Sequence, residues 1–445
     1  MFKKEYIAFM KNWTAVVLAA GRGTRMESDL PKVLHDLKGK PLIYYVLKEL
    51  VSLKRYIRQI IVVVGYQGCF VEESIKKHFK DIGFAYQKKK LGTADAVRCV
   101  QKKVKHQNVL VLCGDAPLIT KKTLSSFIAF SLRKKFLCSL ISAEVNERNS
   151  LGRIIRDREG RIKAICEKGE PAKGFLSNEV NSGIYAFDRG ILFNNLKKIK
   201  KNKKKGEYFL TDIVEILYEA GYSTGSFISE SSEEILGINT LEDLCRVENI
   251  MRMRILDGLM AEGVRIVDSS TTFIEHGVKI GKGTLIYPFT FIEKDVIIGG
   301  NCFLGPFIHL RSGSRIKNST CLGNFVEVNR SVVGPRVKMK HFGYLGDTTV
   351  ESDVNVGAGV VVANFDGKSK NKTYIRKNAF IGSDTVLVAP VKVGKGAVTG
   401  AGSVVTKDVR AKEVVAGVPA RPLKKSKVKN QNAKVQFKIQ KFEKI

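Results

Sequence analysis

The stretch IEHGVKIGKGTLIYPFTFIEKDVIIGGNCFLGPFIHLRSGSRIKNSTCLGNFVEV, residues 274–328, decides the fold of the second half of this chain. Every sixth residue in it is a large aliphatic in one unbroken frame: Ile274, Ile280, Ile286, Ile292, Ile298, Leu304, Leu310, Ile316, Leu322 and Val328. A six-residue period fits neither a helix of about 3.6 residues per turn nor a hairpin meander. It is typical of a β-helix in which each hexad is a short strand plus a corner, so that three hexads make one coil.

The same frame continues, with interruptions, beyond residue 328. It slips by one residue near Val333 and again near Val350, and it resumes from Ile375 to Val405 with Thr399 as its polar member. The pattern predicts a left-handed parallel β-helix of hexapeptide repeats, whose frame residues point into a narrow prism. Because such residues form a scaffold, we expect function to come from the side chains and loops that depart from the period.

The composition suggests a globular chain with a strong basic field. The 445 residues carry a formal net charge of +33, and 44% of them are apolar, which is enough to form sizeable cores in two or three domains. Lysine and arginine are spread along the chain, with dense runs only at 197–205 and 424–429. A basic field attracts any polyanion, including nucleotides and CoA. No nucleic-acid recognition motif accompanies the charge, so we expect no nucleic-acid partner.

The cysteines and the apolar segments bear on the compartment. Eight cysteines are scattered without a CxxC pair, which is typical of a reducing cytoplasm and argues against structural zinc. Lys3 and Lys4 precede apolar residues, but Lys11 and Asn12 interrupt that run, and the sequence holds no apolar segment long enough to span a membrane. We therefore expect a cytoplasmic protein without stable membrane insertion.

The first half of the chain has an α/β pattern. Short aliphatic runs at 15–20, 60–64 and 109–112 are separated by amphipathic stretches of helix length, which predicts buried parallel strands in a Rossmann-like nucleotide-binding domain. The first run leads into the glycine-rich turn 21–26, and Pro31-Lys32 follows shortly after. Its spacing matches neither the dinucleotide fingerprint nor the phosphate loop of NTPases. It does place two cations, Arg25 and Lys32, on one small loop that suits an anion.

A helix is predicted between the two halves. Apolar residues recur at three- to five-residue steps over 241–263, and Gly263 ends the segment. We therefore expect an N-terminal domain over 1–240, a linker helix over 241–263, a β-helix domain over 264–422 and a basic tail over 423–445.

Several motifs in the first half resemble those of nucleotide-sugar pyrophosphorylases. They are LAAGRGTRM at 18–26, LPKVL at 30–34, Gln87 with LGTA at 91–94, GDAPL at 114–118, Gly152-Arg153, Glu167-Lys168, NSG at 181–183, GEYFLTD at 206–212 and GINT at 237–240. Together with the hexapeptide repeats, they make the chain similar to the bacterial bifunctional UDP-N-acetylglucosamine pyrophosphorylases/glucosamine-1-phosphate N-acetyltransferases. The resemblance implies an enzyme of cell-envelope polysaccharide synthesis that uses UTP, acetyl-CoA and Mg²⁺ and assembles as a homotrimer.

Uridylyl transfer brings two anions together, so the protein must mainly neutralise charge and align the reactants. Arg25 and Lys32 suit the triphosphate, and Asp115 follows a strand where a carboxylate can hold Mg²⁺. The resemblance implies Asn239 as the second metal ligand. It implies that UTP and the UDP-sugar contact Leu18, Ala19, Ala20, Gly21, Lys32, Gln87, Gly92, Thr93, Cys113, Gly114, Asp115, Gly152, Glu167, Asn181 and Asn239. Within this set, Cys113 replaces a larger residue that the family often has, commonly Tyr.

In the second half, polar groups beside the hexads and an insertion at 364–374 mark the predicted acetyltransferase site. A histidine has the titration range to accept a proton from an attacking amine, although a lone histidine in a β-helix is more often structural. The run KHFGYLGD at 340–347, with NVGAG at 355–359 and NFDG at 364–367, resembles the acetyltransferase motif and favours His341 as the base.

The same resemblance assigns ligands to this site. It implies that Arg311, Asn329, Tyr344 and Asn355 bind glucosamine 1-phosphate, with Glu327 near the amine. It implies that acetyl-CoA contacts Ala358, Asn364, Phe365, Ser383 and Ala401.

Two departures from the family pattern bear on the acceptor and donor sites. Asn329 stands where the family usually has a phosphate-binding lysine, and Arg330 is beside it. The arginine that the family usually has near the C-terminal end is replaced here, in the segment Gly417-Val-Pro419. Two alternatives also stay open. One is an active uridylyltransferase whose β-helix is only a trimerisation platform. The other is a basic nucleic-acid- or surface-binding protein with a vestigial enzyme fold.

Overall fold

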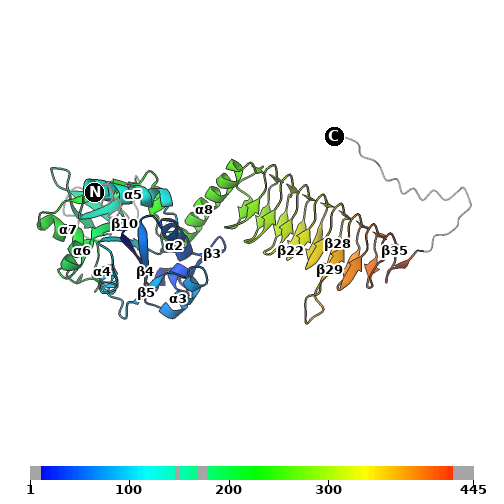
Figure 1. The fold of residues 1–445 in the computed structure, drawn as a ribbon, viewed down its shortest axis with the longest axis horizontal. Coiled ribbons are helices and arrows are strands. Elements are labelled where there is room, and N and C mark those ends of the chain that lie inside the picture. The colour runs from blue at the N-terminus through cyan, green and yellow to red at the C-terminus, as the bar shows by residue number, and fades with distance from the viewer. Residues whose placement is uncertain (1–11, 146–150, 168–177, 424–445) are drawn as a thin grey trace, which may run out of the picture. The chain divides into compact units, whose positions relative to one another are not determined.

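The computed structural model describes residues 12–145, 151–167 and 178–423 of the chain (Figure 1). It divides into two compact units, Met1–Ile255 and Leu256–Ile445. We call them the α/β unit and the β-helix unit. The predicted basic tail lies outside the described residues except for Leu423, and so does Lys168 of the Glu167-Lys168 motif.

The α/β unit is built on a sheet of nine strands. Its main path runs β11-β7-β10-β6-β1-β4-β5, with β8 beside β10 and β9 beside β8. The strands are β1 (Trp13–Ala19), β4 (Ile57–Val64), β5 (Gly83–Tyr86), β6 (Asn108–Cys113), β7 (Cys138–Glu144), β8 (Arg153–Arg156), β9 (Ile162–Cys166), β10 (Glu179–Asp188) and β11 (Thr224–Ile228). β1, β4, β5 and β6 are parallel, and β10 runs antiparallel to β6 and β7. The three predicted strands are confirmed as β1, β4 and β6.

Helices cover both faces of this sheet. They are α2 (Leu42–Ser52), α3 (Gly68–Lys76), α4 (Thr93–Arg98), α5 (Lys121–Lys134), α6 (Arg189–Leu196) and α7 (Asp212–Glu219). α2, α3 and α5 pack with Ala15 and Val17 in one core, whereas α4, α6 and α7 pack with Val16 in the other. Successive side chains of a strand point to opposite faces, so a strand covered on both sides has to be apolar throughout.

Short elements and one long helix complete the unit. They are the 3₁₀ turns η1 (Thr24–Met26), η2 (Lys32–Leu34) and η3 (Ser232–Ile235), the hairpin β2 (Asp36–Leu37) and β3 (Lys40–Pro41), and α8 (Leu241–Ala261). The helix predicted over 241–263 is therefore present as α8, and the division between the two units falls within it. No helix in the described ranges has the length and apolar character needed to cross a bilayer.

The β-helix unit consists of three stacked parallel sheets. The first contains β12 (Arg265–Ile266), β15 (Leu285–Ile286), β18 (Phe303–Leu304), β21 (Cys321–Leu322), β24 (Lys338–Met339), β27 (Asn355–Val356), β30 (Phe380–Ile381), β33 (Val398–Thr399), β35 (Val414–Ala416) and the antiparallel β36 (Arg421–Pro422). The second contains β13 (Thr272–Ile274), β16 (Thr290–Ile292), β19 (Ile308–Leu310), β22 (Val326–Asn329), β25 (Gly343–Gly346), β28 (Val360–Ala363), β31 (Val386–Val388) and β34 (Val404–Val405). The third contains β14 (Lys279–Ile280), β17 (Ile297–Ile298), β20 (Arg315–Ile316), β23 (Val332–Val333), β26 (Thr348–Val350), β29 (Thr373–Ile375) and β32 (Val391–Val393).

From β12 to β34, each strand pairs with the strand three places along the chain, which confirms the predicted coil of three hexads, whereas β35 pairs with β33. Ile274 pairs with Ile292 and Ile292 with Leu310, so these coils contain 18 residues. All ten frame residues from Ile274 to Val328 are buried. The predicted slips are shorter coils, since Ile316 pairs with Val333 and Val333 with Val350, only 17 residues apart.

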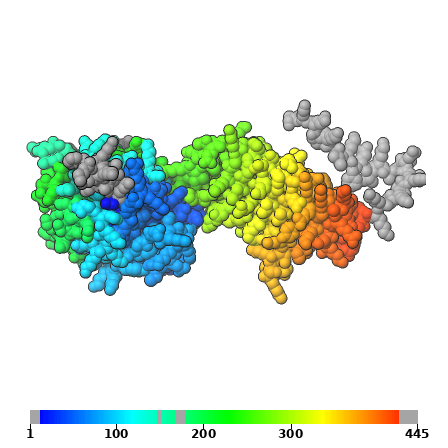
Figure 2. All heavy atoms as spheres, viewed as in Figure 1, coloured from blue at the N-terminus to red at the C-terminus, as the bar shows by residue number. Residues whose placement is uncertain are grey.

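The inserted loop interrupts the stack between β28 and β29. Val350 pairs with Ile375, so this coil is 25 residues long. Phe365 and Lys370 form an antiparallel bridge within the insertion, which protrudes from the coils (Figures 1 and 2). The sequence placed the loop at 364–374, but Thr373 and Tyr374 belong to β29, because backbone pairing with β26 extends over them.

Candidate active sites

The glycine-rich turn follows β1 at the carboxyl edge of the parallel strands. Leu18 pairs with Cys113 of β6, and the N–H of Gly114 donates to the Leu18 carbonyl over 2.9 Å. Gly23 has φ of 73°, and a Cβ there would lie 2.6 Å from the Lys32 Cβ. Glycine therefore lets the Lys32 segment pack directly on the turn.

Four of the predicted residues meet around one ammonium group. Lys32 forms an ion pair with Asp115 and donates from Nζ to Asn239 Oδ1 over 2.9 Å. Arg25 donates from Nη2 to the same Asn239 oxygen over 3.0 Å. The Lys32 side chain is only 12% exposed and that of Asp115 22%, so the contacts lie in a partly desolvated recess where charge interactions are strengthened.

Asn239 reaches this cluster because the chain before α8 is fixed at two points. The N–H of Ile238 donates to the Asp115 carbonyl over 2.9 Å. Thr240 and Asp243 form a capping box, in which the Thr240 N–H donates to Asp243 Oδ2 and the Asp243 N–H to Thr240 Oγ1. The Asn239 N–H also donates to Asp243 Oδ2, over 2.8 Å. Asp243 thus holds the predicted metal ligand although it was not predicted itself, and the T-x-x-D spacing was a signal for it.

The two predicted metal ligands fit a magnesium ion. Asp115 and Asn239 both accept from Lys32 Nζ, so one carboxylate and one amide oxygen converge on a single cation. Mg²⁺ prefers such oxygen ligands and fills its remaining positions with water and substrate phosphates. In the described part of the chain, no group of three or more His, Cys, Asp or Glu could hold a metal on its own.

The residues predicted for the base follow β5. Gln87 donates from Nε2 to the Gly92 carbonyl over 3.0 Å and to Asp95 Oδ2 over 2.8 Å. Gly92 has φ of 95°, and a Cβ there would lie 2.5 Å from the Tyr208 carbonyl oxygen, so only glycine fits. Thr93 Oγ1 accepts from the Leu210 N–H over 2.9 Å.

The residues predicted for the sugar lie around β8, β9 and β10. The Asn181 N–H donates to the Gly152 carbonyl over 2.8 Å, and Thr211 Oγ1 donates to Glu167 Oε1 over 3.0 Å. Leu210 contacts Thr93, so the consecutive residues Leu210 and Thr211 join the base and sugar regions. Sequence reasoning gave Thr211 no role, although it lies in the GEYFLTD motif.

Cys113 ends β6 beside these groups. Burial raises the pKa of its thiol to about 12, and the nearby Asp115 carboxylate adds to the shift. The thiol is therefore neutral at pH 7 and does not act as a nucleophile.

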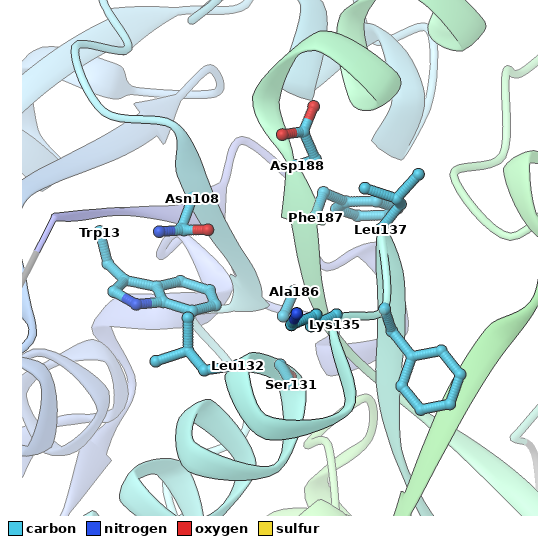
Figure 3. Close-up of a pocket in the computed structure, with 10 residues that line it drawn as sticks. Trp13, Asn108, Ser131, Leu132, Lys135, Leu137, Ala186, Phe187 and Asp188 are labelled. Atoms are coloured by element: carbon cyan, nitrogen blue, oxygen red, sulfur yellow. The ribbon is translucent and has the colours of Figure 1, made fainter. Parts of the chain in front are cut away.

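Two cavities of this unit lie apart from the predicted site residues. One of about 320 Å³ sits at the opposite, amino edge of the sheet, between Trp13 and Asn108 on one side and Leu137 and Phe187 on the other (Figure 3). The other, of about 650 Å³, is lined by Lys198, Lys200 and α7. The predicted residues instead line the open carboxyl edge, where ligands of parallel sheets bind.

In the β-helix unit, four predicted residues occupy one corner in successive coils. They are His341, Ala358, Ser383 and Ala401. The stacking follows from the hydrogen bonds of their neighbours, because the Gly359 N–H donates to the Phe342 carbonyl, Asp384 to Ala358 and Gly402 to Ser383. His341 is exposed. The small residues above it leave room at the corner for an extended ligand.

The outward face of the second sheet carries the next group. Glu327 pairs with Tyr344 of the following coil, and Arg311 donates from Nη1 to Glu327 Oε1 over 3.1 Å. A Cβ on Gly346 would lie 2.5 Å from the Tyr344 hydroxyl and 2.7 Å from Asn364 Nδ2, so these two side chains converge over that glycine. Asn355 is not part of this group, because it lies in the first sheet, paired with Lys338 and Phe380.

Asn329, which stands where the family usually has a lysine, and its neighbour Arg330 are both held by hydrogen bonds. Asn329 is buried, and its Oδ1 accepts from Arg330 Nη1 over 2.9 Å. Arg330 also binds Asp347 through two nitrogens, each over 2.8 Å. Asn364 Nδ2 donates to Asp347 Oδ2 over 2.5 Å. Asp347 ends the KHFGYLGD run quoted above, but it was given no role of its own.

Three phenylalanines form a stacked column of rings, the aromatic ladder, on one corner of successive coils near the start of the β-helix unit. Phe289, Phe307 and Phe325 are 53%, 43% and 59% exposed, and their rings stack with centroids 4.7 and 4.8 Å apart. Exposed, aligned aromatic rings of this kind are common at protein interfaces.

Comparisons with known proteins agree with both halves of this description. The sequence pattern of the nucleotidyl transferase family matches residues 14–247, and that of the bacterial transferase hexapeptide (six repeats) matches residues 372–407. The chain is 36% identical to bifunctional protein GlmU of Clostridium botulinum over 433 residues, covering 89% of this chain and 93% of that protein. It is 38% identical to bifunctional protein GlmU of Acetivibrio thermocellus, covering 89% and 92%. It is also 38% identical to bifunctional protein GlmU of Heliobacterium modesticaldum, covering 90% and 94%.

Both family patterns fall on the unit that carries the corresponding architecture, and the relatives align along nearly the whole chain. The chain therefore belongs to the family of bifunctional GlmU proteins.

Proposed function

We propose that the chain makes UDP-N-acetylglucosamine for cell-envelope polysaccharides in two steps, in the cytoplasm. Residues 264–422 transfer an acetyl group from acetyl-CoA to the amine of glucosamine 1-phosphate and release CoA. Residues 1–240 then transfer UMP from UTP to N-acetylglucosamine 1-phosphate and release pyrophosphate. Membership of the bifunctional family supports the pair of activities, and the residues of each site are assigned below.

The cluster around Lys32 carries the uridylyl transfer assignment. The phosphate oxygen of the sugar attacks the α-phosphorus of UTP, and the bond to pyrophosphate breaks. Both reactants are anions, so Lys32 and Arg25 serve by donating to phosphate oxygens and neutralising their charge. Asp115 and Asn239 would hold Mg²⁺, which supplies further neutralisation of the phosphates when bound. Their shared contact with one ammonium supports this role.

The nucleotide and sugar contacts follow the same edge of the sheet. We assign Leu18 to Gly21, Cys113 and Gly114 to the backbone cradle of the nucleotide, and Gln87, Gly92 and Thr93 to the base. Gly152, Glu167 and Asn181 are assigned to the sugar. The link through Leu210 and Thr211 supports placing base and sugar side by side.

His341 carries the acetyl transfer assignment. The amine nitrogen attacks the thioester carbonyl carbon, the carbon–sulfur bond breaks, and His341 takes the proton that the nitrogen loses. The CoA thiolate leaves and takes up a proton. Arg311, Asn329 and Tyr344 are assigned to glucosamine 1-phosphate, and Ala358, Asn364, Phe365, Ser383 and Ala401 to acetyl-CoA. Asn355 is assigned to glucosamine 1-phosphate on the family resemblance alone, because it lies in the first sheet, away from Tyr344. The column above His341 supports an extended donor.

The assembly is proposed to be a homotrimer. The ladder of Phe289, Phe307 and Phe325 is an apolar surface that a second copy could cover, and closed symmetry would bury one ladder per chain. Sedimentation equilibrium should give three times the mass of the chain. A monomer at assay concentration with acetyl transfer intact would exclude this assembly.

One assay tests the two activities. The protein is incubated with UTP, glucosamine 1-phosphate, acetyl-CoA and Mg²⁺, and CoA and pyrophosphate are followed separately. We expect CoA release first and pyrophosphate release after it. Pyrophosphate release from pre-acetylated substrate without any CoA release would instead support an active uridylyltransferase whose β-helix is a trimerisation platform.

A further inference from the structure

Two arginine–aspartate pairs of the β-helix unit have nearly the same geometry. Arg330 binds Asp347 from Nε and Nη2, both over 2.8 Å. Arg336 binds Asp353 from the same two nitrogens, over 2.7 and 2.9 Å. In each pair the aspartate follows the arginine by 17 residues, and all four residues have φ between 47° and 62°. The two pairs therefore contribute equivalent links between successive coils.

The surroundings of the two aspartates differ. Asp347 Oδ2 also accepts from Asn364 Nδ2, and the Arg330 guanidinium is held on Asn329. Among the residues that the structure describes, Asp353 has only its neighbour Ser352 as a further side-chain donor. The Arg330 hydrogen bonds hold the pKa of Asp347 below its usual range, so this carboxylate is ionised at neutral pH and acts only as an acceptor.

An ionised acceptor fixes which way the Asn364 amide faces. Only the NH₂ group of an asparagine can donate to a carboxylate, so Asn364 Oδ1 remains as an acceptor for another group. Asn364 is only 8% exposed, and its carbonyl accepts from the Asn371 N–H over 2.7 Å, which closes the base of the inserted loop. The side chain of Asn364 is thus held by Asp347 and its backbone by Asn371, at the base of the loop.

We propose that Arg330 and Asp347 are positioning residues for acetyl transfer, because together they fix the Asn364 amide, at the base of the 364–372 loop, against the acyl donor. Arg330 thus acts through Asn329 and Asp347 rather than as a replacement for the family's lysine at position 329. The inference rests on the proposed acetyltransferase function, and it adds two residues that the family resemblance does not assign.

The test compares Arg330→Gln with Arg336→Gln in the full chain. We expect Arg330→Gln to lower kcat/KM for acetyl-CoA by about tenfold, since a misplaced contact residue costs rate without removing the chemistry. Arg336→Gln should stay within about twofold of the unchanged protein. The two variants should lose similar thermal stability, because they lose the same inter-coil link. KM for glucosamine 1-phosphate should change less than kcat/KM for acetyl-CoA in Arg330→Gln, because Arg330 also contacts Asn329, and it should not change in Arg336→Gln.

A second variant keeps the proposal testable even if Arg330→Gln fails to fold. Asp347→Asn has the same shape but can donate as well as accept, so it should release the Asn364 amide and also lower kcat/KM for acetyl-CoA about tenfold. The double variant Arg330→Gln/Asp347→Asn should be no worse than the single ones, since residues of one unit are not additive.

Three results would overturn the proposal. They are an equal loss of acetyl transfer in Arg336→Gln, a selective rise of KM for glucosamine 1-phosphate in Arg330→Gln, and fully additive losses in the double variant. Failure of the proposed function itself would give a different experimental result. In that case the unchanged protein would release no CoA, whereas these results all require a normal rate in the unchanged protein.

Discussion

The two proposed sites are built in opposite ways. In the α/β unit, Lys32 and Asn239 are 207 residues apart in the chain and meet in a recess with little solvent. In the β-helix unit, His341 and Ala358 lie one coil apart, and His341 is exposed on a rigid stack. A closed polar cluster fails as a whole when one member is lost, whereas groups displayed on a scaffold can be removed singly. The predictions below test this difference.

The largest effect is expected from Asp115→Ala. The change removes a proposed metal ligand and leaves Lys32 without its carboxylate partner. Metal and charge stabilisation of this kind is worth several kcal/mol, so pyrophosphate release should fall by about 10⁴-fold. CoA release from the same preparation should stay within about twofold, which also serves as the control for folding. A parallel fall of both rates in a folded variant would contradict a local role.

His341→Ala is expected to lower CoA release by about 10²–10⁴-fold, the usual span for loss of a positioned general base. Pyrophosphate release from pre-acetylated substrate should keep its rate. Because His341 lies on a scaffold, the thermal stability of the variant should match that of the unchanged protein. Near-normal CoA release from a folded variant would leave the substrate amine, beside Glu327, to react without a protein base.

The third prediction concerns the core of the scaffold. Leu304 is fully buried in the stack, so Leu304→Ala should destabilise the β-helix unit by about 2–5 kcal/mol through lost burial and a cavity. Calorimetry should show that one transition moves to lower temperature. Pyrophosphate release below that transition should be unchanged. A shift of every transition by the same amount would mean that the two units unfold together.

The smallest effect is expected from Glu179→Gln in the α/β unit. Burial alone would raise the pKa of Glu179, but hydrogen bonds from Ser142, Ser226 and Arg156 hold it below its ordinary value. A carboxyl with a lower pKa in the folded state stabilises the fold above its ordinary pKa and loses that contribution as pH falls through the folded value. Glu179→Gln should cost about 1–3 kcal/mol at pH 7 in urea unfolding. The stability of the variant should also fall less between pH 5 and pH 3 than the stability of the unchanged protein. An equal fall in both proteins would contradict the role given to the Glu179 carboxylate.

Much of the β-helix was predictable because its period is a local property of the sequence. Frame residues such as Ile274 and Leu310 repeat at a fixed spacing, and each occupies the same corner of its coil. The shortened coils and the insertion were visible as slips of that frame. The end of the insertion was misplaced by two residues, since pairing of Thr373 with Thr348 depends on a neighbouring coil.

The α/β site was less accessible from spacing alone. Arg25, Lys32 and Asp115 follow from strand ends and charge, but their meeting with Asn239 depends on the tertiary fold. The capping box at Thr240 and Asp243 was readable and was missed. Asp347 ends a motif that was recognised, but its role could not be predicted, because the partner that distinguishes it from Asp353 is the side chain of a residue in the inserted loop.

The chain contains a single tryptophan, Trp13, which begins β1 and is 2% exposed. Its indole nitrogen is buried and has no hydrogen-bond partner among the described residues, so the ring is shielded from water. Fluorescence excited selectively in tryptophan therefore comes from the α/β unit alone, and the β-helix unit is silent in that channel. Its emission should move to longer wavelength only when the sheet around Trp13 opens to water, so an optical titration can follow one unit while far-UV circular dichroism follows both.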